Sequence, residues 1–397
     1  MIPQSDAVHI LSAVRTPIGS LNGALSSLRA HELGSQVIRE AVVRSSIAPE
    51  DVSEVIIGQA LTAAQGQNPA RQAALGAGLP YTIPAYSVNM VCGSGLRSVV
   101  LGYQSIKCGD ASVIISGGQE SMSQAPHACF VRKGIKMGPT NFIDTMTHDG
   151  LTDAFNNYHM GITAENLAKQ FNVLREEQDI FAVKSQQKTE AAMKNNDFKQ
   201  EILPIVVQSR NGSKVVSEDE FPRHGCTLEA LSKLNPCFVK DGTGTVTAGN
   251  SSGVNDGAAA LVLASESEVK NRHLQPMATI ISWGQGAVDP AIMGYGPVPA
   301  VKNALSKANW TKDDVDLWEV NEAFAVQSLV VIRALGLDEE KVNVSGGSVS
   351  LGHPIGASGA RILVTLLHNL KRLNKKKGVA CLCIGGGMGI ALCVETV

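Results

Sequence analysis

The sequence lacks several of the signals that would assign a class of protein at once. Its 34 basic and 36 acidic residues leave a formal net charge of −2, so no overall positive charge attracts nucleic acid or an anionic membrane. Only 18% of the residues are charged and 44% are hydrophobic, a composition that excludes an intrinsically disordered chain. Local positive groups would therefore have to bind any small anionic ligand.

The eight cysteines are scattered and form no Cys-x-x-Cys pair, which argues against a structural zinc site. Their one close pair, Cys381 and Cys383, lies in an apolar run where alternate residues share a face of a strand. The sequence also has no secretory leader, no Arg-rich transit segment before the strand-like residues near Val8, and no peroxisomal Ser-Lys-Leu ending. We therefore expect reduced thiols, no bound metal and a cytosolic protein.

An internal repeat predicts two similar halves. The 397 residues exceed what one hydrophobic core usually supports, and alternating strand-like and helix-like segments predict an α/β protein with a mainly parallel sheet covered on both faces. Residues 49–60 (PEDVSEVIIGQA) align with 312–323 (KDDVDLWEVNEA), and residues 115–118 align with 384–387 in the same order. Two such halves are expected to pack against each other.

Residues 120–249 differ in kind from the two halves. Long loop-like stretches surround a single helix expected over 164–194, as in an insertion that covers a pocket and supplies ligand contacts. We therefore divide the chain into a first half (1–119 with 250–272), an inserted loop domain (120–249) and a second half (273–397).

Two glycine-lined turns carry residues capable of chemistry. Cys92 precedes Gly-Ser-Gly and a helical segment, so the positive end of the helix dipole is expected to lower its thiol pKa. His353 lies in a comparable turn of the second half, before Pro354, and a helix is expected to begin at His353. Pseudo-symmetry would bring the two turns together, and a cysteine beside a histidine is a recurring activated nucleophile.

Each of these residues also has a plainer interpretation. A single Cys-Gly-Ser-Gly turn is more often an inert buried cysteine, by roughly three to one. His353 also fits a helix cap, Cys383 a strand residue pointing into the core, and Asn321 an ordinary turn residue. Glycines on both sides of His353 favour a site, because a cap does not require an open backbone around it.

Eight motifs, in order along nearly the whole chain, resemble those of the thiolase family, most closely its cytosolic type specific for acetyl-CoA. They are VNMVCGSG (88–95), GGQESMS (117–123), MGITAEN (160–166), FPRHG (221–225), TAGNSSG (247–253), NEAF (321–324), GHPIGASG (352–359) and CIGGGMG (383–389). The resemblance implies a thiolase-like α/β fold: two pseudo-symmetric halves with mixed or mainly parallel sheets, αβαβα layers, and an inserted loop domain that binds coenzyme A.

The resemblance implies the condensation of two acetyl-CoA to acetoacetyl-CoA, and the reverse thiolysis, by a ping-pong scheme. Cys92 would be the acyl-accepting nucleophile, His353 its activating base, and Cys383 the base that removes an α-proton. One oxyanion site would consist of His353 and a water held by Asn321, and the other of the backbone N–H groups of Cys92 and Gly385. Two negative oxygens develop in such a condensation, so fixed donors aimed at each are expected to supply much of the rate.

The resemblance also implies ligand contacts, partners and three departures from the family pattern. Coenzyme A would contact Arg223, Cys226 and Ser252, and the acyl and pantetheine pocket would be lined by His159, Met160, Phe238, Met293, Ala323 and Phe324. Cys226 stands where Ser or Thr is common, and Ser348 and Ser98 stand where Ala is usual. We expect no cofactor besides the thioester substrates, a homo-oligomer built as a dimer of dimers, and no nucleic-acid or membrane partner.

Two other functions stay open at this point. A degradative 3-ketoacyl-CoA thiolase for longer chains is disfavoured by Met293, which resembles the pocket-closing residue of short-chain enzymes. A thiolase-fold protein that binds coenzyme A esters without turnover is disfavoured by the four catalytic residue types, which all stand at the positions the family pattern requires.

Overall fold

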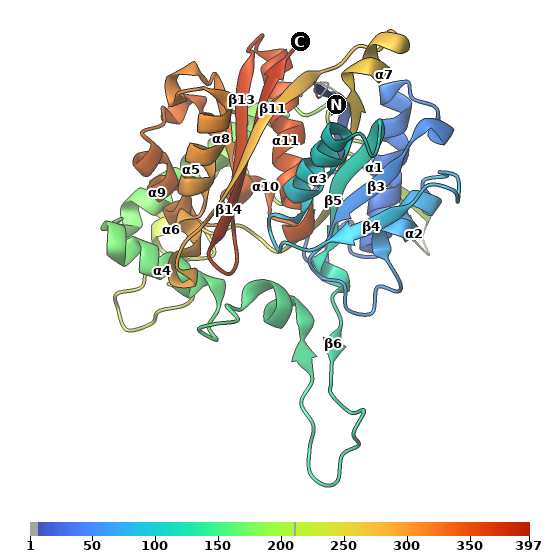
Figure 1. Ribbon diagram of the computed structural model, residues 1–397. Coiled ribbons are helices and arrows are strands. Elements are labelled where there is room, and N and C mark those ends of the chain that lie inside the picture. Colours follow the sequence, from blue (N-terminus) through green and yellow to red (C-terminus); the bar gives the residue numbers. More distant parts are fainter. Residues whose placement is uncertain (1–6, 210–211) are drawn as a thin grey trace.

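A mixed β-sheet forms the framework of the protein. The computed structural model describes residues 7–209 and 212–397, and in this part of the chain the main sheet has ten strands (Figure 1). Their order is β12-β13-β14-β11-β1-β10-β5-β3-β4, with β2 paired to β10. The strands are β1 (Val8–Arg15), β2 (Gly19–Ser20), β3 (Glu54–Gly58), β4 (Ala85–Val88), β5 (Val113–Ser121), β10 (Asn255–Ser265), β11 (Ala278–Ala287), β12 (Leu317–Val320), β13 (Lys377–Ile384) and β14 (Met388–Thr396).

The pairing within this sheet is less parallel than the sequence pattern indicates. Parallel pairs join β3 to β4, β3 to β5 and β12 to β13, whereas the remaining pairs are antiparallel. The expectation of a mixed sheet is confirmed, but its mainly parallel character is wrong. One reason is that β14 returns from β13 through a short glycine turn, and tight hairpins join antiparallel strands.

The repeat read from the sequence is present in the structure. The 3-10 turns η1 (Pro49–Asp51) and η5 (Lys312–Asp314) lead into β3 and β12. β3 pairs in parallel with β5, which contains residues 115–118. β12 likewise pairs in parallel with β13, which ends at Ile384, the first residue of the matching segment 384–387. The two halves join in the centre of the sheet, where β1 and β11 pair antiparallel. The two halves therefore share one continuous sheet.

Helices cover the outer faces and also lie between the halves. Helices α1 (Ala30–Ser45) and α2 (Pro69–Gly76) pack with the first half, and α8 (Pro297–Ala308) and α9 (Ala325–Leu335) pack with the second. The central helices are α3 (Ser94–Cys108) and α11 (Ile355–Arg372), which contact each other and strands of both halves. As its apolar sequence predicts, α11 is buried on most faces. It begins at Ile355, two residues later than expected, with Pro354 at its N-cap.

The inserted segment contains more regular structure than expected. It holds β6 (His127–Ala128), β7 (Ile143–Asp144), a π-helix η3 (Met146–Leu151), α4 (Met160–Phe171), α5 (Arg175–Lys194), β8 (Ile205–Ser209), β9 (Gly212–Val216) and α6 (Leu228–Ser232). The single helix expected over 164–194 is two helices, because Asn172 adopts a left-handed conformation (φ 52°) that ends α4.

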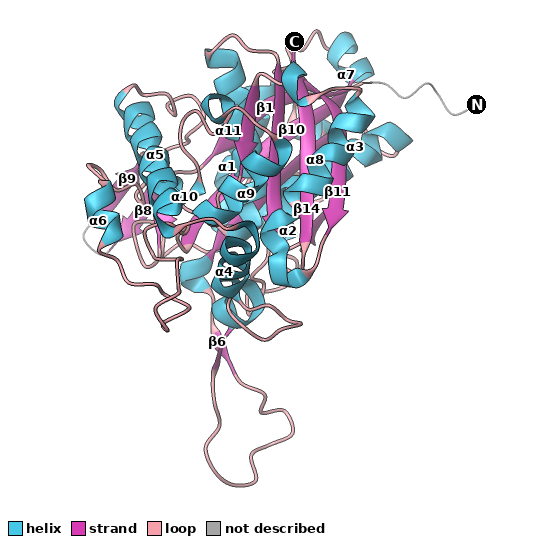
Figure 2. Cartoon of the chain, turned by 90° about the vertical axis from the view of Figure 1, so that its left-hand side faces the viewer, coloured by secondary structure: helices cyan, strands magenta, loops and turns pink. Residues whose placement is uncertain are grey.

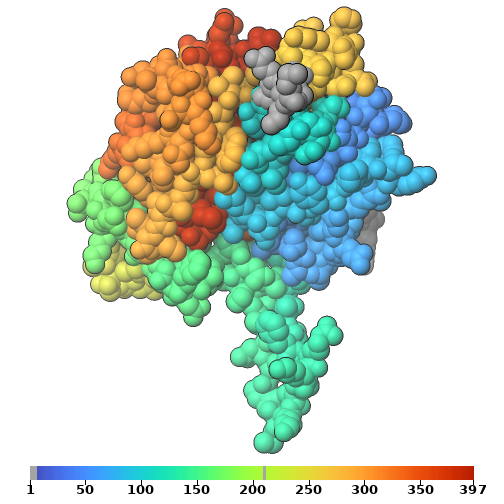
Figure 3. All heavy atoms as spheres, viewed as in Figure 1, coloured from blue at the N-terminus to red at the C-terminus, as the bar shows by residue number. Residues whose placement is uncertain are grey.

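The segment between β6 and β7 extends away from the rest of the molecule in both ribbon views (Figures 1 and 2) and forms the long projection in the space-filling view (Figure 3). After the insertion the chain re-enters the sheet as β10, and α7 (Glu266–Asn271) leads to the second half. The proposed division into three domains stays a prediction. No helix of the described residues is long and apolar enough to cross a membrane.

Candidate functional site

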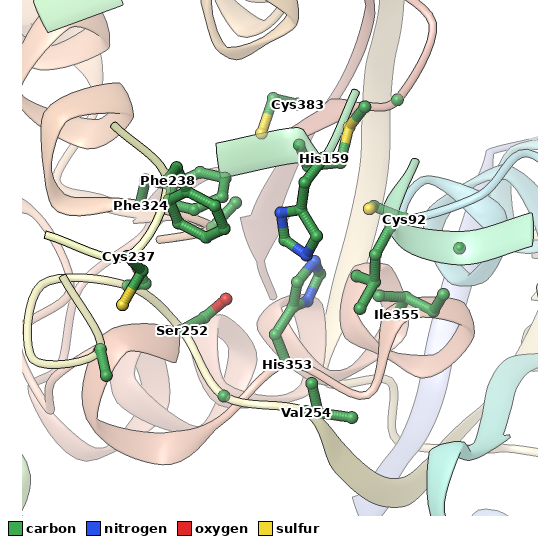
Figure 4. A pocket seen from close by; sticks show the side chains of 18 of the residues that line it. Cys92, His159, Cys237, Phe238, Ser252, Val254, Phe324, His353, Ile355 and Cys383 are labelled. Atoms are coloured by element: carbon green, nitrogen blue, oxygen red, sulfur yellow. The ribbon is translucent and has the colours of Figure 1, made fainter. Parts of the chain in front are cut away.

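A cavity of about 240 Å3 lies where the two central helices begin (Figure 4). Cys92 reaches it from the turn before α3, His353 from the turn before α11, and Cys383 from the end of β13. The backbone at Gly385 also lines it. The structure therefore brings together residues that are nearly 300 positions apart in the sequence, as the pseudo-symmetry of the two halves predicts.

Cys92 is held in a strained turn. The preceding residue, Val91, has a φ of 47°, which is rare for a β-branched side chain and costs energy that surrounding contacts must offset. The hydroxyl of Ser94 donates to the Val91 carbonyl at 2.6 Å and accepts from the N–H of Met90 at 2.8 Å. These two bonds close the turn that contains Cys92.

Burial governs the acidity of Cys92. It raises the pKa of the thiol to about 11, while hydrogen bonds from the backbone N–H groups of Gly385 and of Cys92 itself act in the opposite direction. The lowered pKa expected from the helix dipole is therefore wrong, because desolvation of the thiolate outweighs the helix end. The resting thiol is protonated at neutral pH.

The hydrogen bonds of His353 assign its tautomer. Its Nδ1 lies 2.6 Å from the Ser358 hydroxyl oxygen, and that hydroxyl donates its own hydrogen to the Pro354 carbonyl at 2.9 Å. Since Ser358 has no second hydrogen, Nδ1–H is the donor and Nε2 carries the lone pair. Nε2 is buried and has no hydrogen-bond partner among the described residues.

Electrostatics keep the imidazole of His353 neutral. Burial lowers its pKa to about 3, and the positive charge of Arg361 acts in the same direction. A neutral imidazole with a free Nε2 therefore shares the cavity with the neutral thiol of Cys92. This arrangement is that of a general base and a protonated nucleophile, not of a preformed ion pair.

Cys383 is almost inaccessible to solvent, with 1% of its surface exposed. Burial raises the pKa of its thiol well above the ordinary value, and the neighbouring Cys92 sulfur adds to this effect. A thiol with such a pKa holds its proton in the resting state, and its thiolate, once formed, is a strong base.

Asn321 is not among the residues that line the cavity, and it is fully buried directly after β12. Its backbone N–H donates to the Cys381 carbonyl at 2.9 Å, and its Oδ1 accepts from the Ser348 hydroxyl at 2.6 Å. Its Nδ2 has no hydrogen-bond partner among the described residues. An amide N–H2 group in this state is available for a water or a ligand oxygen.

The residues expected around the acyl and pantetheine groups do line the cavity: His159, Met160, Phe238, Met293, Ala323 and Phe324. Ser252, expected to contact coenzyme A, lines it as well. His159 stacks on Phe238, with ring centroids 4.6 Å apart. Its Nδ1 accepts from the N–H of Gly161 at 3.0 Å, which leaves Nε2 as the protonated nitrogen of the neutral ring. Burial lowers the pKa of this histidine and favours that neutral form.

Arg223 and Cys226 are not among the residues that line the cavity. Arg223 is exposed, and its guanidinium lies 5.6 Å from the ring centroid of Phe221, a ring that packs directly against Gly253 of the cavity wall. Cys226 packs beside the small apolar cluster around Leu231. Both residues therefore stand outside the cavity, and Phe221 lies between Arg223 and the cavity wall at Gly253.

Five further residues line the cavity and were not predicted individually: Met122, Leu151, Cys237, Val254 and Ile355. Met122 and Ile355 lie inside the motifs GGQESMS and GHPIGASG. The other three lie outside every motif, and only the tertiary structure brings them to the cavity.

Buried Glu120 supports the site from beneath, accepting from the N–H groups of Ala60 and Gly356 at 2.9 Å each. Burial raises its pKa to about 8. Glu120 belongs to the GGQESMS motif, and this motif could have indicated its role at the site. Among the described residues, no group of three or more His, Cys, Asp and Glu side chains is disposed to hold a metal ion.

Comparison with known proteins identifies relatives along the whole chain. The family model "Thiolase, N-terminal domain" matches residues 8–267, and "Thiolase, C-terminal domain" matches residues 274–396. The chain is 57% identical over 391 residues to the cytosolic acetyl-CoA acetyltransferase of Rattus norvegicus, covering 98% of each. It is 55% identical over 387 residues to the acetyl-CoA acetyltransferase of Shinella zoogloeoides, again covering 98% of each. The crystal structure of the Bacillus anthracis acetyl-CoA acetyltransferase superposes with a TM-score of 0.97 at 44% identity, covering 99% of both chains.

Proposed function

The chain belongs to the thiolase family, and on this premise we propose that it is an acetyl-CoA C-acetyltransferase. It condenses two acetyl-CoA molecules to acetoacetyl-CoA and coenzyme A, and it catalyses the reverse thiolysis. The observation that carries this proposal is the meeting of Cys92, His353 and Cys383 at one cavity. The names of relatives that share more than half of its residues support acetyl-CoA as the substrate.

The first half-reaction transfers the acetyl group to Cys92. The free Nε2 of His353 takes the thiol proton, the sulfur attacks the thioester carbonyl, and the bond to the coenzyme A sulfur breaks. The leaving sulfur needs a proton, and the thiol of Cys383 is the group at the cavity that supplies it. The step ends with acetyl-Cys92, a protonated His353 and a Cys383 thiolate.

The charges left by this step suit the second half-reaction. The Cys383 thiolate removes an α-proton from the second acetyl-CoA, and the resulting carbanion attacks the carbonyl of acetyl-Cys92. When the carbon–sulfur bond to Cys92 breaks, His353 returns the proton to that sulfur. Protons therefore balance over the cycle with no other acid or base.

Hydrogen-bond donors stand near both negative oxygens of this scheme. The backbone N–H groups of Cys92 and Gly385 donate to the Cys92 sulfur. In the tetrahedral intermediate, the oxygen of the acetyl group would lie beside that sulfur, within reach of the same two donors. Protonated His353 and a water held by the unpartnered Nδ2 of Asn321 serve the enolate oxygen. Such fixed donors in a water-poor site are usually the largest source of rate.

The lining of the cavity favours short acyl groups and coenzyme A. Met293, with 4% of its surface exposed, packs against the same apolar cluster as Met160 and Phe324, so the cavity is closed at that wall. Ser252 lies in the wall, and exposed Arg223 lies just outside it, where it is available for a phosphate of the coenzyme. No metal or further cofactor is needed for the scheme.

We further propose a cytosolic homo-oligomer, built as a dimer of dimers. The cytosolic relative supports the location. The projecting segment between β6 and β7 supports self-association, because Phe130 and Met137 on it are 90% and 94% exposed and an apolar surface of this kind commonly marks a protein contact.

Thiolysis rates on 3-ketoacyl-CoA substrates from four to sixteen carbons test the proposed specificity. Mass mapping after incubation with labelled acetyl-CoA tests the proposed nucleophile. We expect the four-carbon substrate to react fastest and the label to be found on Cys92. Faster thiolysis of long chains would indicate a degradative thiolase, and binding without label would indicate a coenzyme A-ester binding protein.

A further inference from the structure

Ser348 connects Asn321 to a buried arginine. It is the first residue of the short helix α10 (Ser348–Leu351) and is fully buried. Its hydroxyl oxygen lies 2.6 Å from Oδ1 of Asn321 and 3.0 Å from Nη2 of Arg361. An alanine, the residue usual at this position in the family pattern, would make neither bond.

The direction of these two bonds follows from what each group can do. A guanidinium only donates, so Arg361 donates to the Ser348 oxygen. The hydroxyl donates its single hydrogen to the amide oxygen of Asn321. This orients the amide with Oδ1 toward Ser348 and leaves Nδ2 as the free donor, which agrees with its lack of a partner among the described residues.

Arg361 is itself fixed in the core. It is 2% exposed, its Nη1 lies 3.8 Å from a carboxylate oxygen of Glu319, and Nη1 donates to the Thr365 hydroxyl at 3.5 Å. It is near enough to His353 for its charge to help lower the pKa of that imidazole. One buried cation therefore acts on His353 through space and on Asn321 through Ser348.

We propose that Ser348 is a positioning residue for the condensation step, which holds the Asn321 amide with its N–H2 group free to bind the water at the enolate oxygen. This inference rests on the proposed function, because it assigns Ser348 a task only in the half-reaction that forms an enolate. Acetylation of Cys92 uses the backbone N–H groups instead and does not depend on Ser348.

The test compares the two half-reactions in the Ser348→Ala variant of the full-length protein. Rapid mixing with acetyl-CoA gives the rate of Cys92 acetylation from the burst of released coenzyme A, and acetoacetyl-CoA formation gives the condensation rate. We expect unchanged acetylation and condensation slower by about ten-fold, the effect of losing one well-placed hydrogen bond. Ser350→Ala is the matched control, because it removes a buried hydroxyl from the same helix. That hydroxyl bonds to the Gly347 carbonyl and to the hydroxyls of Ser185 and Thr189, but not to Asn321. The variant should condense at the wild-type rate.

A double-mutant cycle separates positioning from a general structural role. If Ser348 acts through Asn321, adding Ser348→Ala to Asn321→Ala should cost nothing further in condensation. An equal ten-fold loss in both backgrounds, or unchanged condensation in Ser348→Ala alone, overturns the proposal. If Ser348→Ala does not fold, as judged by thermal unfolding, Ser348→Cys replaces the hydroxyl with a weak donor, and an unchanged condensation rate in it also overturns the proposal. Failure of the wild-type protein to acetylate Cys92 at all would instead refute the proposed function.

Discussion

Gly95 of α3 and Gly359 of α11 face each other where these helices cross. A β carbon on Gly95 would lie 2.7 Å from the backbone nitrogen of Ala360, and one on Gly359 would lie still closer to a backbone nitrogen of α3. Neither helix can carry a side chain there unless the two separate. Because Cys92 and His353 stand in the turns that lead into these helices, the close crossing sets the separation of thiol and imidazole.

The Gly359→Ala variant should lose both stability and activity. The added methyl group meets backbone rather than a flexible side chain, so the helices must shift, at a cost of about 1–3 kcal/mol. Denaturant unfolding and the rate of Cys92 acetylation measure the two effects. An unchanged unfolding midpoint would show that the crossing has room for a side chain.

Variants of Cys92 and of Cys383 should fail at different steps of the reaction. Cys92→Ser should prevent acetylation by labelled acetyl-CoA, because a serine hydroxyl is a much weaker nucleophile at this site than a cysteine sulfur. Cys383→Ser should still acquire the acetyl group on Cys92 but condense poorly, because the α-proton lacks its base. Mass mapping and acetoacetyl-CoA formation measure these outcomes. Condensation at the wild-type rate in Cys383→Ser would contradict its role as the base.

Local patterns in the sequence predicted the parts of the fold that depend on local physics. The apolar faces of α11, the repeat that relates β3 to β12, and the strand that ends near Cys383 all follow from residue spacing. The break at Asn172 also had a local signal, since Asn readily takes the left-handed conformation that ends a helix. The direction of strand pairing had none, because it depends on where distant segments return to the sheet.

The features of the site also divide into those that local sequence patterns predicted and those that they did not. The glycine turns together with the internal repeat predicted that Cys92 and His353 meet, whereas the grouping of Met293 with Phe238 depended on family resemblance. The thiol pKa was predicted in the wrong direction because a turn and a helix end are local, while burial of Cys92 is produced by residues from other segments, such as Met122 and Ile355, that share its apolar cluster.

The reactivity of Cys92 in the free protein should rise steadily with pH. Its pKa is raised to about 11 and that of His353 is lowered to about 3, so both groups are neutral between these values and the thiolate fraction increases about ten-fold per pH unit below 11. Iodoacetamide labelling followed by mass mapping should therefore show no plateau between pH 7 and pH 10. A thiolate–imidazolium pair would give a plateau through this range.

The same two pKa shifts make the stability of the folded protein depend on pH in opposite directions. The pKa of the Cys92 thiol is 9.0 in the unfolded chain and about 11 in the folded protein. Between pH 9.0 and about pH 11, the folded protein therefore holds a proton that the unfolded chain has lost. Its contribution to stability is therefore present below pH 9 and lost as the pH rises. His353 is harder to protonate when folded, so its contribution is lost as the pH falls from 6.5 toward about 3. Denaturant unfolding of Cys92→Ser and His353→Ala should each lack the corresponding pH dependence.

Met293→Ala should shift specificity toward longer acyl chains. Met293 is buried in the cavity wall, and its truncation leaves space for additional methylene groups, each worth about ten-fold in discrimination. Six-carbon and four-carbon substrates differ by two methylene groups, so we expect the ratio of their thiolysis rates to rise by about a hundred-fold. Met193→Ala is the control, because this methionine packs with Phe198 in a different cluster and should lower stability without changing the ratio. An equal ratio in the wild type and Met293→Ala would show that another residue limits chain length.

Ser358→Ala should slow acetylation by weakening the control of the His353 tautomer. In the structure the Ser358 oxygen accepts from Nδ1–H at 2.6 Å because its own hydrogen is given to the Pro354 carbonyl. Without this acceptor, the tautomer that carries its hydrogen on Nε2 becomes competitive, and that tautomer cannot take the proton from Cys92. Losing one hydrogen bond of this kind corresponds to about a ten-fold lower acetylation rate, with little change in KM because Ser358 is not among the residues that line the cavity. Presteady-state release of coenzyme A measures the rate, and thermal unfolding shows whether the variant is folded. A folded Ser358→Ala variant that acetylates Cys92 at the wild-type rate would mean that the cavity itself fixes the imidazole.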